Sequence, residues 1–168
     1  MKFSSSAFGS RRRTRYRPWL STAASEEPRL EVDADNDLAY ISGDFSNIGG
    51  AGRFTVASLL LNQNNNNATN WNPSPDHEVS TLEFSDLDDT VLVGGLFTSI
   101  GGSSRNFLAQ LRTDDNSAPP TSWDPNPNDQ VIALEWTGAE NDPKLFSGGS
   151  FRSIGRSAHS SFAVFDDQ

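Results

Sequence analysis

The sequence predicts an all-β protein built from repeated antiparallel units. Its 168 residues are 35% hydrophobic and 21% charged, with abundant Gly, Asn, Ser, Asp and Pro. That composition is typical of short strands joined by turns rather than of helices. The stretch VGGLFTSIGG (93–102) also has counterparts in ISGDFSNIGG (41–50) and SGGSFRSIGR (147–156). Composition and repetition together favour several copies of one β-unit.

The repeat has a consistent register along the chain. The second glycine of the motif falls at Gly43, Gly95 and Gly149, which are 52 and 54 residues apart. WNPSPDHEVSTLEF (71–84) aligns with WDPNPNDQVIALEW (123–136). Trp71 and Trp123 each lie 11 residues before a repeated leucine, and Trp19 lies 11 residues before Leu30. Further landmarks in step are Phe45, Phe97 and Phe151; Ile48, Ile100 and Ile154; Ala57, Ala109 and Ala163; and Leu30, Leu82 and Leu134.

Each unit is predicted to contain four short strands. The first strand is Val79–Phe84 or Val131–Trp136, and the second is Val91–Gly94. The third is Phe107–Arg112, and the fourth is a short segment that ends at Trp71 or Trp123, where a nearby proline cannot extend a ladder. A four-stranded antiparallel unit that recurs about every 40–50 residues is typical of a β-propeller blade.

The recurrent glycines fit this architecture. The second strand is expected near the propeller axis, where glycine lets neighbouring backbones approach closely. The later Gly-Gly pair is expected to form a positive-φ turn before the third strand. A nucleotide-binding glycine loop is disfavoured, because no helix pattern follows these glycines and the motif recurs in each unit.

The second unit also resembles a known repeat family. Its residues Arg105, Asn106, Leu108, Ala109 and Leu111 follow the pattern of the delta-60-type propeller repeats of bacterial surface proteins, and more loosely of fungal cell-polarity cortical markers. The resemblance covers roughly 27–166. The first unit departs from it at Phe54, and the third at Arg156, His159 and Ser160. The resemblance implies a propeller used for binding or display, generally outside the cell, and implies no catalytic residues.

The order of predicted strands suggests how the chain assembles. We expect a basic disordered arm over 1–13, an orphan outer strand over 14–19, and blades over 27–71, 79–123 and 131–166, the last without its fourth strand. Natural propellers have about 4–8 blades, so three do not close a ring comfortably. The leading hypothesis is a head-to-tail homodimer with six blades, in which the strand carrying Tyr16 and Trp19 completes the partner's third blade. A fragment of a longer propeller, pairing with other propeller segments and a stable arc remain alternatives.

Charge and composition restrict partners and compartment. The net charge is −9, and the first 18 residues contribute +6, so the remainder carries −15. An acidic body disfavours nucleic-acid binding, and no apolar run is long enough to predict a membrane span. There is no cysteine, which rules out disulfides and thiolate metal sites. The resemblance points to the cell exterior or surface, whereas the N-terminus is a poor secretory signal, so cytoplasm and organelle stay open.

The variable turns are the predicted binding face. The turns between the first and second strands, and between the third and fourth, are expected to share one acidic face, which contacts a protein or a glycan. Its predicted residues are Asp33, Asp35, Asp37, Asp86, Asp88, Asp89, Asp114, Asp115, Glu140 and Asp142. DADND (33–37) resembles the start of a calcium loop, but Leu38 stands where glycine is expected, so a solvated turn is favoured and no metal or cofactor is predicted.

Catalysis finds little support in the sequence. His77 and His159 are the only histidines, and neither is near a serine nucleophile with an orienting aspartate. The tryptophans are expected to pack in the core rather than stack on sugars. The leading function is therefore a non-catalytic binding or scaffold module. A carbohydrate hydrolase or lyase at the ring centre is the alternative, and it requires a pair of buried carboxylates at the axis. A purely structural assembly role is a third possibility.

Overall fold

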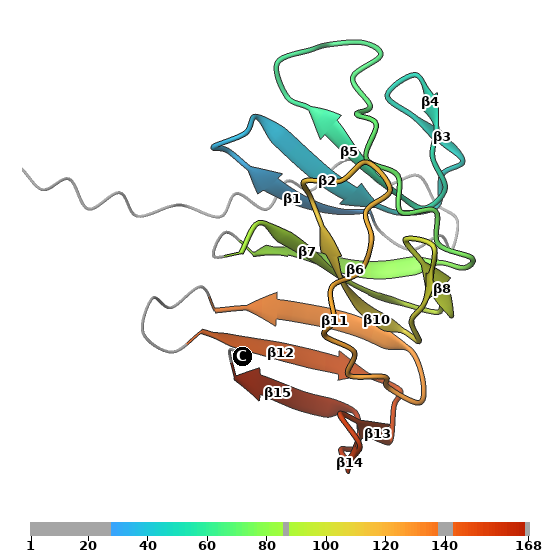
Figure 1. Cartoon of the computed structure of the whole chain (residues 1–168), viewed down its shortest axis with the longest axis vertical. Coiled ribbons are helices and arrows are strands. Elements are labelled where there is room, and N and C mark those ends of the chain that lie inside the picture. The colour runs from blue at the N-terminus through green and yellow to red at the C-terminus, as the bar shows by residue number, and fades with distance from the viewer. Residues whose placement is uncertain (1–27, 86–87, 138–142, 167–168) are drawn as a thin grey trace, which may run out of the picture.

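The computed structural model describes residues 28–85, 88–137 and 143–166. Within these ranges the protein consists of fifteen strands and no helix (Figure 1), so the predicted all-β class is confirmed for this part of the chain. No helix capable of crossing a membrane is found among the described residues.

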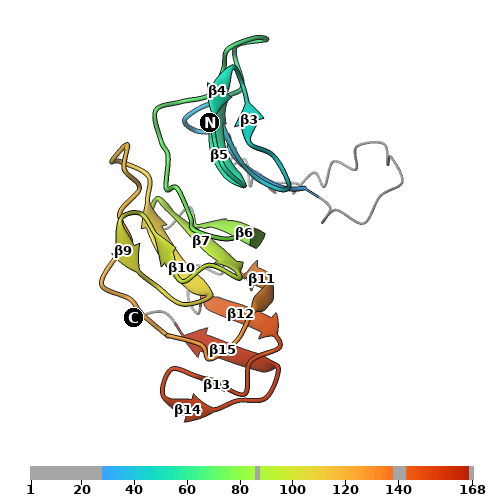
Figure 2. The ribbon, with the colours of Figure 1, turned by 90° about the vertical axis from the view of Figure 1, so that its right-hand side faces the viewer.

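Three antiparallel sheets of three strands follow one another along the chain, and in each the second strand lies in the middle. We call them units 1, 2 and 3. Figure 2 shows unit 1 at the top, unit 3 at the bottom and unit 2 between them. Their strands are β1 (Arg29–Asp33), β2 (Leu38–Ser42) and β5 (Val56–Leu60); β6 (Val79–Ser85), β7 (Thr90–Gly95) and β10 (Leu108–Arg112); and β11 (Val131–Trp136), β12 (Lys144–Gly149) and β15 (Phe162–Asp166).

Each of the three sheets has three strands in the described residues, so four-stranded units are not confirmed, and a single bridge lies where the fourth strand was predicted in units 1 and 2. In unit 1 an isolated antiparallel bridge joins Leu59 to Ala68, and in unit 2 another joins Leu111 to Pro120. The unit 1 segment is held by backbone hydrogen bonds, from Leu60 N to Asn67 O at 2.7 Å and from Thr69 N to Ser58 O at 2.9 Å. The predicted strand over 14–19 lies outside the described residues.

A small hairpin connects the second and third main strands of every unit. These hairpins pair β3 (Asn47–Ile48) with β4 (Ala51–Gly52), β8 (Ser99–Ile100) with β9 (Ser103–Ser104), and β13 (Ser153–Ile154) with β14 (Ser157–Ala158). Their turns use Gly49 and Gly50 with φ of 58° and 79°, and Gly101 and Gly102 with φ of 58° and 74°. Two successive positive-φ residues suit a tight hairpin turn, so the predicted conformation of the Gly-Gly pair is confirmed.

Close backbone approach explains the glycines on the second strand. A Cβ placed on Gly95 would lie 2.1 Å from Glu78 O, and one on Gly149 would lie 2.1 Å from Gln130 O. Both positions face a register shift in the first strand of their own unit. Between units, β6 contacts both β1 and β11, β2 contacts β6, and β7 contacts β11. The first and second strands therefore both take part in the contacts between neighbouring units.

The hydrophobic core consists of two layers, one at each junction between units. Junction 1–2 buries Phe97 and Ile100, and junction 2–3 buries their repeat equivalents Phe151 and Ile154. Unit 1 contributes Tyr40 and Val56 to the first layer, whereas unit 2 contributes Leu92 and Leu108 to the second. One face of each unit thus packs against the opposite face of the next.

Candidate functional site

In units 1 and 2 the turn after the third strand is hydrogen-bonded to the turn between the first and second strands. In unit 1 the backbone nitrogen of Leu61, after β5, donates to Asp37 O in the β1–β2 turn at 2.8 Å. In unit 2 the hydroxyl of Thr113, after β10, donates to Asp89 O in the β6–β7 turn at 2.5 Å. We call the surface formed by the turns that contain Asp33–Asp37, Asp88–Asp89 and Asp114–Asp115 the acidic turn face.

Asp33 is used within its own turn. It is buried, with 5% of its surface exposed. Its carboxylate accepts hydrogen bonds from the backbone nitrogens of Asp35 and Asn36 at 3.2 and 3.1 Å, and from the Asn36 side chain at 2.8 Å. Asp35 and Asp37 are exposed. Among the described residues, no group of three or more His, Cys, Asp or Glu side chains is placed to hold a metal ion.

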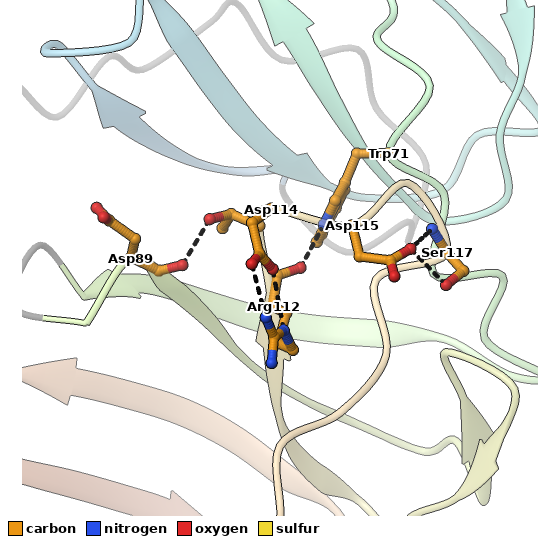
Figure 3. Close-up of polar contacts among 7 residues, drawn as sticks. Trp71, Asp89, Arg112, Asp114, Asp115 and Ser117 are labelled. Carbon is orange, nitrogen blue, oxygen red and sulfur yellow. Dashed lines mark hydrogen bonds and ion pairs between the residues drawn. The ribbon is translucent and has the colours of Figure 1, made fainter.

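Asp114 and Asp115 occupy the turn that follows β10 (Figure 3). Asp114 accepts two hydrogen bonds from the Arg112 guanidinium, at 2.9 and 2.6 Å, and this pairing lowers the pKa of the Asp114 carboxyl. Asp115 accepts bonds from the hydroxyl and the backbone nitrogen of Ser117, and these lower its pKa as well. Both carboxylates are exposed and stay charged well below neutral pH.

Of the other predicted turn residues, some form hydrogen bonds and others are not among the described residues. Asp88 accepts a hydrogen bond from the Thr90 hydroxyl at 2.8 Å and one from the Gln110 side chain at 2.6 Å. Asp86, Glu140 and Asp142 are not among the described residues, and neither are Tyr16 and Trp19.

A packed aromatic cluster lies under these turns. Tyr40 contacts Trp71 edge-on, with ring centroids 5.3 Å apart, and stacks on Phe84 at 5.5 Å. Burial, together with the nearby charges of Asp33 and Asp89, raises the pKa of Tyr40 to about 12. Trp71 is 4% exposed, and its indole nitrogen donates to Arg112 O at 2.9 Å (Figure 3). Trp71 therefore packs in the core, as predicted, and is not available to stack on a sugar.

One repeated carboxylate was not singled out from the sequence. Glu31, Glu83 and Glu135 each follow the landmark leucine of their unit, on the strands that meet between units. Glu83 is 3% exposed, and its Oε1 accepts a hydrogen bond from Trp136 N at 3.2 Å. The recurrence of the Leu-Glu pair at the same position in each unit is the feature of the sequence that could have identified these glutamates. Its visible role at Glu83 is to join unit 2 to unit 3.

The two histidines lie in different loops, and both are exposed. His77 Nδ1 lies 3.6 Å from Asp76 Oδ2, and its side chain is 66% exposed. Asp76 accepts hydrogen bonds from the Thr98 hydroxyl and from the backbone nitrogens of Thr98 and Ser99. Although desolvation opposes them, these bonds lower the pKa of Asp76 to about 2. His159 is exposed on the hairpin of unit 3. Within the described residues neither imidazole is hydrogen-bonded to a serine.

A cavity of about 510 Å³ opens at the end of the sheets opposite the acidic turn face. It lies at junction 2–3, between the start of β10, the connection from unit 2 to unit 3, and the β13–β14 hairpin. It is lined by Asn106, Phe107, Asp124, Asn126, Pro127, Asn128, Ser153 and Arg156. Of the residues that line this cavity, none was among those predicted from the sequence to bind a ligand.

Comparison with known proteins supports the architecture and leaves the activity open. A family model described as a beta-propeller domain of unknown function (DUF5122) matches residues 87–116, which run from the β6–β7 turn to the turn after β10. This short match supports a propeller repeat family. Curated proteins give no match, and neither do solved structures. The family match and the three antiparallel sheets together indicate a β-propeller domain.

Proposed function

We propose that the protein is a non-catalytic propeller scaffold that closes its ring with a second copy of itself and binds a protein or a glycan through the acidic turn face. The observation that carries this proposal is the exposure of two apolar sheet faces at opposite ends of the molecule. Each is the repeat equivalent of a face that is buried at a junction.

The first open face belongs to unit 3. Ile132, Phe162 and Val164 are 47%, 55% and 41% exposed, and Phe162 stacks on Phe146 with ring centroids 6.1 Å apart. The repeat equivalents of Phe146 and Phe162 in unit 2 are Leu92 and Leu108, which are 3% and 0% exposed at junction 2–3. The sequence therefore places aromatic side chains where the neighbouring unit uses buried leucines.

The second open face belongs to unit 1. Leu30 and Val32 are 40% and 47% exposed. Their equivalents in unit 3, Leu134 and Trp136, are 8% and 9% exposed because they pack on unit 2. Unit 1 thus carries the kind of face that covers the preceding unit at both junctions.

The two open faces are complementary by construction. At each junction, the repeat equivalents of Phe162 pack against the repeat equivalents of Leu30 and Val32. One chain therefore carries one exposed face of each kind. Contiguous exposed apolar surface of this kind marks an interaction site, and its burial is the main favourable term in association. Two copies joined at both ends would supply six sheets, within the range of about 4–8 blades seen in propellers.

The acidic turn face stays accessible in such a ring, because it lies at the strand ends rather than on the sheet faces. Asp35, Asp114 and Asp115 are exposed there. Loops that differ between repeats on a constant scaffold are where binding function concentrates. The paired and capped carboxylates of this face supply fixed acceptors for basic or hydroxyl groups of a partner.

The mass in solution tests this proposal. Light scattering on the full chain is expected to give a species near twice 18.3 kDa. Phe162→Lys should convert it to a monomer, because a charge would be buried at the contact. Phe54→Lys is the matched control: Phe54 is 51% exposed but lies outside both end faces, so this variant should remain a dimer. A wild-type monomer at all concentrations, or equal dissociation of both variants, would refute head-to-tail assembly.

A further inference from the structure

Arg156 has a backbone conformation that its residue type disfavours. It is the second turn residue of the β13–β14 hairpin, with φ of 66°. The equivalent positions in units 1 and 2 are Gly50 and Gly102, with φ of 79° and 74°. Glycine adopts this region freely, whereas other residues are strained there. Arg156 is also one of the residues that line the cavity, and backbone strain at such a residue points to a functional role for it.

The corresponding place at junction 1–2 is lined differently. Gly102 takes the position of Arg156, Phe54 that of Asn106, and Ser74 that of Asn126. The strand and hairpin framework is the same at both junctions. Arg156 and Asn126 therefore distinguish this cavity from junction 1–2, whereas Asn106 follows the repeat pattern from which Phe54 departs.

The cavity combines a cation with polar and apolar groups. Asn106 Nδ2 donates to Asn126 Oδ1 at 2.8 Å, which leaves the Asn106 carbonyl and the Asn126 amino group without a partner among the described residues. Asn128 Oδ1 accepts from the backbone nitrogens of Arg152 and Ser153, at 2.8 and 3.0 Å, so its amino group remains a donor. Phe107 and Pro127 add apolar surface.

The carboxylate of Asp124 narrows the ligand class. Asp124 lines the cavity, and its carboxylate lies 4.0 Å from the Arg105 guanidinium. A compact multivalent anion such as phosphate would be repelled by this carboxylate. A larger ligand can place one anionic group at Arg156 and hydroxyl groups near Asp124, because a carboxylate is a strong acceptor for hydroxyl donors.

We propose that this cavity binds a carboxylate-bearing saccharide of the uronic-acid type. The Arg156 guanidinium binds the sugar carboxylate through two parallel hydrogen bonds. The amides of Asn106 and Asn126 bind ring hydroxyls, and Phe107 with Pro127 packs against the apolar face of the sugar ring. A volume of about 510 Å³ falls within the range of about 300–1,000 Å³ typical of small-molecule sites.

This site is separate from the proposed function. It lies at the opposite strand ends from the acidic turn face, and it is formed within one chain, so it does not require a second copy. Loss of sugar binding and loss of dimer formation can therefore be measured independently in the same samples.

Isothermal titration calorimetry on the full chain tests the proposal, with trimers of galacturonate, glucuronate and mannuronate as probes. At least one uronate trimer is expected to bind, whereas a neutral galactose trimer and inorganic phosphate should not. Arg156→Gly is expected to weaken binding at least tenfold. This variant should fold normally, because glycine suits a positive φ and stands at the equivalent position of both other units.

Arg152→Ala is the matched control. Arg152 lies on the same hairpin and carries the same charge but does not line the cavity, so its replacement should leave the affinity unchanged. Absence of binding by every uronate trimer overturns the proposal. Equal weakening by both variants, or binding of phosphate in place of the saccharide, also overturns it, because these results indicate a general charge effect or a simple anion site.

Discussion

Junction 1–2 and junction 2–3 bury phenylalanines at equivalent positions but differ in some of their side-chain hydrogen bonds. Phe97 and Phe151 are both 0% exposed at equivalent positions. Across junction 1–2, however, the Trp71 indole donates to Arg112 O. Across junction 2–3, Glu83 accepts from Trp136 N, and the Gln130 side chain donates to the Ser80 hydroxyl at 2.9 Å. The comparison teaches that the buried phenylalanine positions are repeated from unit to unit, while the side-chain hydrogen bonds of Trp71 and Gln130 belong to one junction each.

One repeat position shows how the neighbouring unit decides what a residue can be. It is occupied by Ser42, Gly94 and Gly148 in the three units. A Cβ on Gly94 would lie 2.7 Å from Val131 Cγ1, across junction 2–3, and 2.9 Å from Thr81 Cγ2 in its own sheet. A Cβ on Gly148 would meet nothing closer than Ala133 Cβ at 3.6 Å, because unit 3 ends the described series. Ser42 already accommodates a side chain facing junction 1–2, where it is buried.

The largest effect is expected from Gly94→Ala. Its new methyl group would press on the fully buried Val131, so the free energy of unfolding should fall by about 2–3 kcal/mol, as is usual for overpacking. Gly148→Ala has the same chemistry at the same repeat position and should leave the stability of the monomer unchanged or slightly raised. Urea denaturation of both variants measures the difference. Equal destabilisation would show that the constraint lies within the sheet rather than at the junction.

The second prediction concerns the two repeated tryptophans. Trp71→Phe removes the hydrogen bond to Arg112 O and should lower the free energy of unfolding by about 1–2 kcal/mol. Trp123→Phe should cost less, because in the described part of the chain its indole nitrogen donates no hydrogen bond and its ring contact with Phe165 can be kept. Thermal denaturation compares the two. A larger loss at Trp123 would contradict the view that junction 1–2 depends on this polar contact.

The sequence was sufficient for the repeating framework. Strand Val131–Trp136 has the predicted bounds, and Gly49, Gly50, Gly101 and Gly102 have the predicted positive φ. These features depend on local rules: alternation of apolar residues specifies a strand, and tight hairpin turns need residues that accept a positive φ. Because the rules act within a few residues and recur at one spacing, the repeats reinforce one another.

Contacts between units were much harder to anticipate. The cavity beside Arg156 and the bond from Trp136 N to Glu83 each join residues from different repeats. Aligning the repeats does not show how far apart the faces of neighbouring units lie. The alignment therefore showed that Arg156 replaces a glycine, but not that it lines a cavity. The burial of Asp33 was missed for another reason, since its carboxylate folds back onto its own turn rather than projecting outward.

The smallest expected effect is a difference between the two junctions in how stability depends on pH. Asp76 at junction 1–2 and Asn128 at junction 2–3 occupy equivalent positions, and each side chain accepts hydrogen bonds from two successive backbone nitrogens of the following hairpin. Only Asp76 titrates. Its pKa falls from 3.8 to about 2 in the folded protein. Its contribution to stability is therefore fully present above about pH 4 and is lost as the pH falls through about 2, because the unfolded chain binds the proton first.

Asp76→Asn should keep the hydrogen bonds to the backbone and reduce the slope of stability against pH between about pH 4 and 2. Asn128→Asp should do the reverse and steepen that slope, since it places a carboxylate in the same ring of donors. Urea denaturation at a series of pH values measures both slopes. If Asp76→Asn left the slope unchanged, the hydrogen bonds at this position would not discriminate between the charged and neutral side chains, and the two junctions would be equivalent in this respect as well.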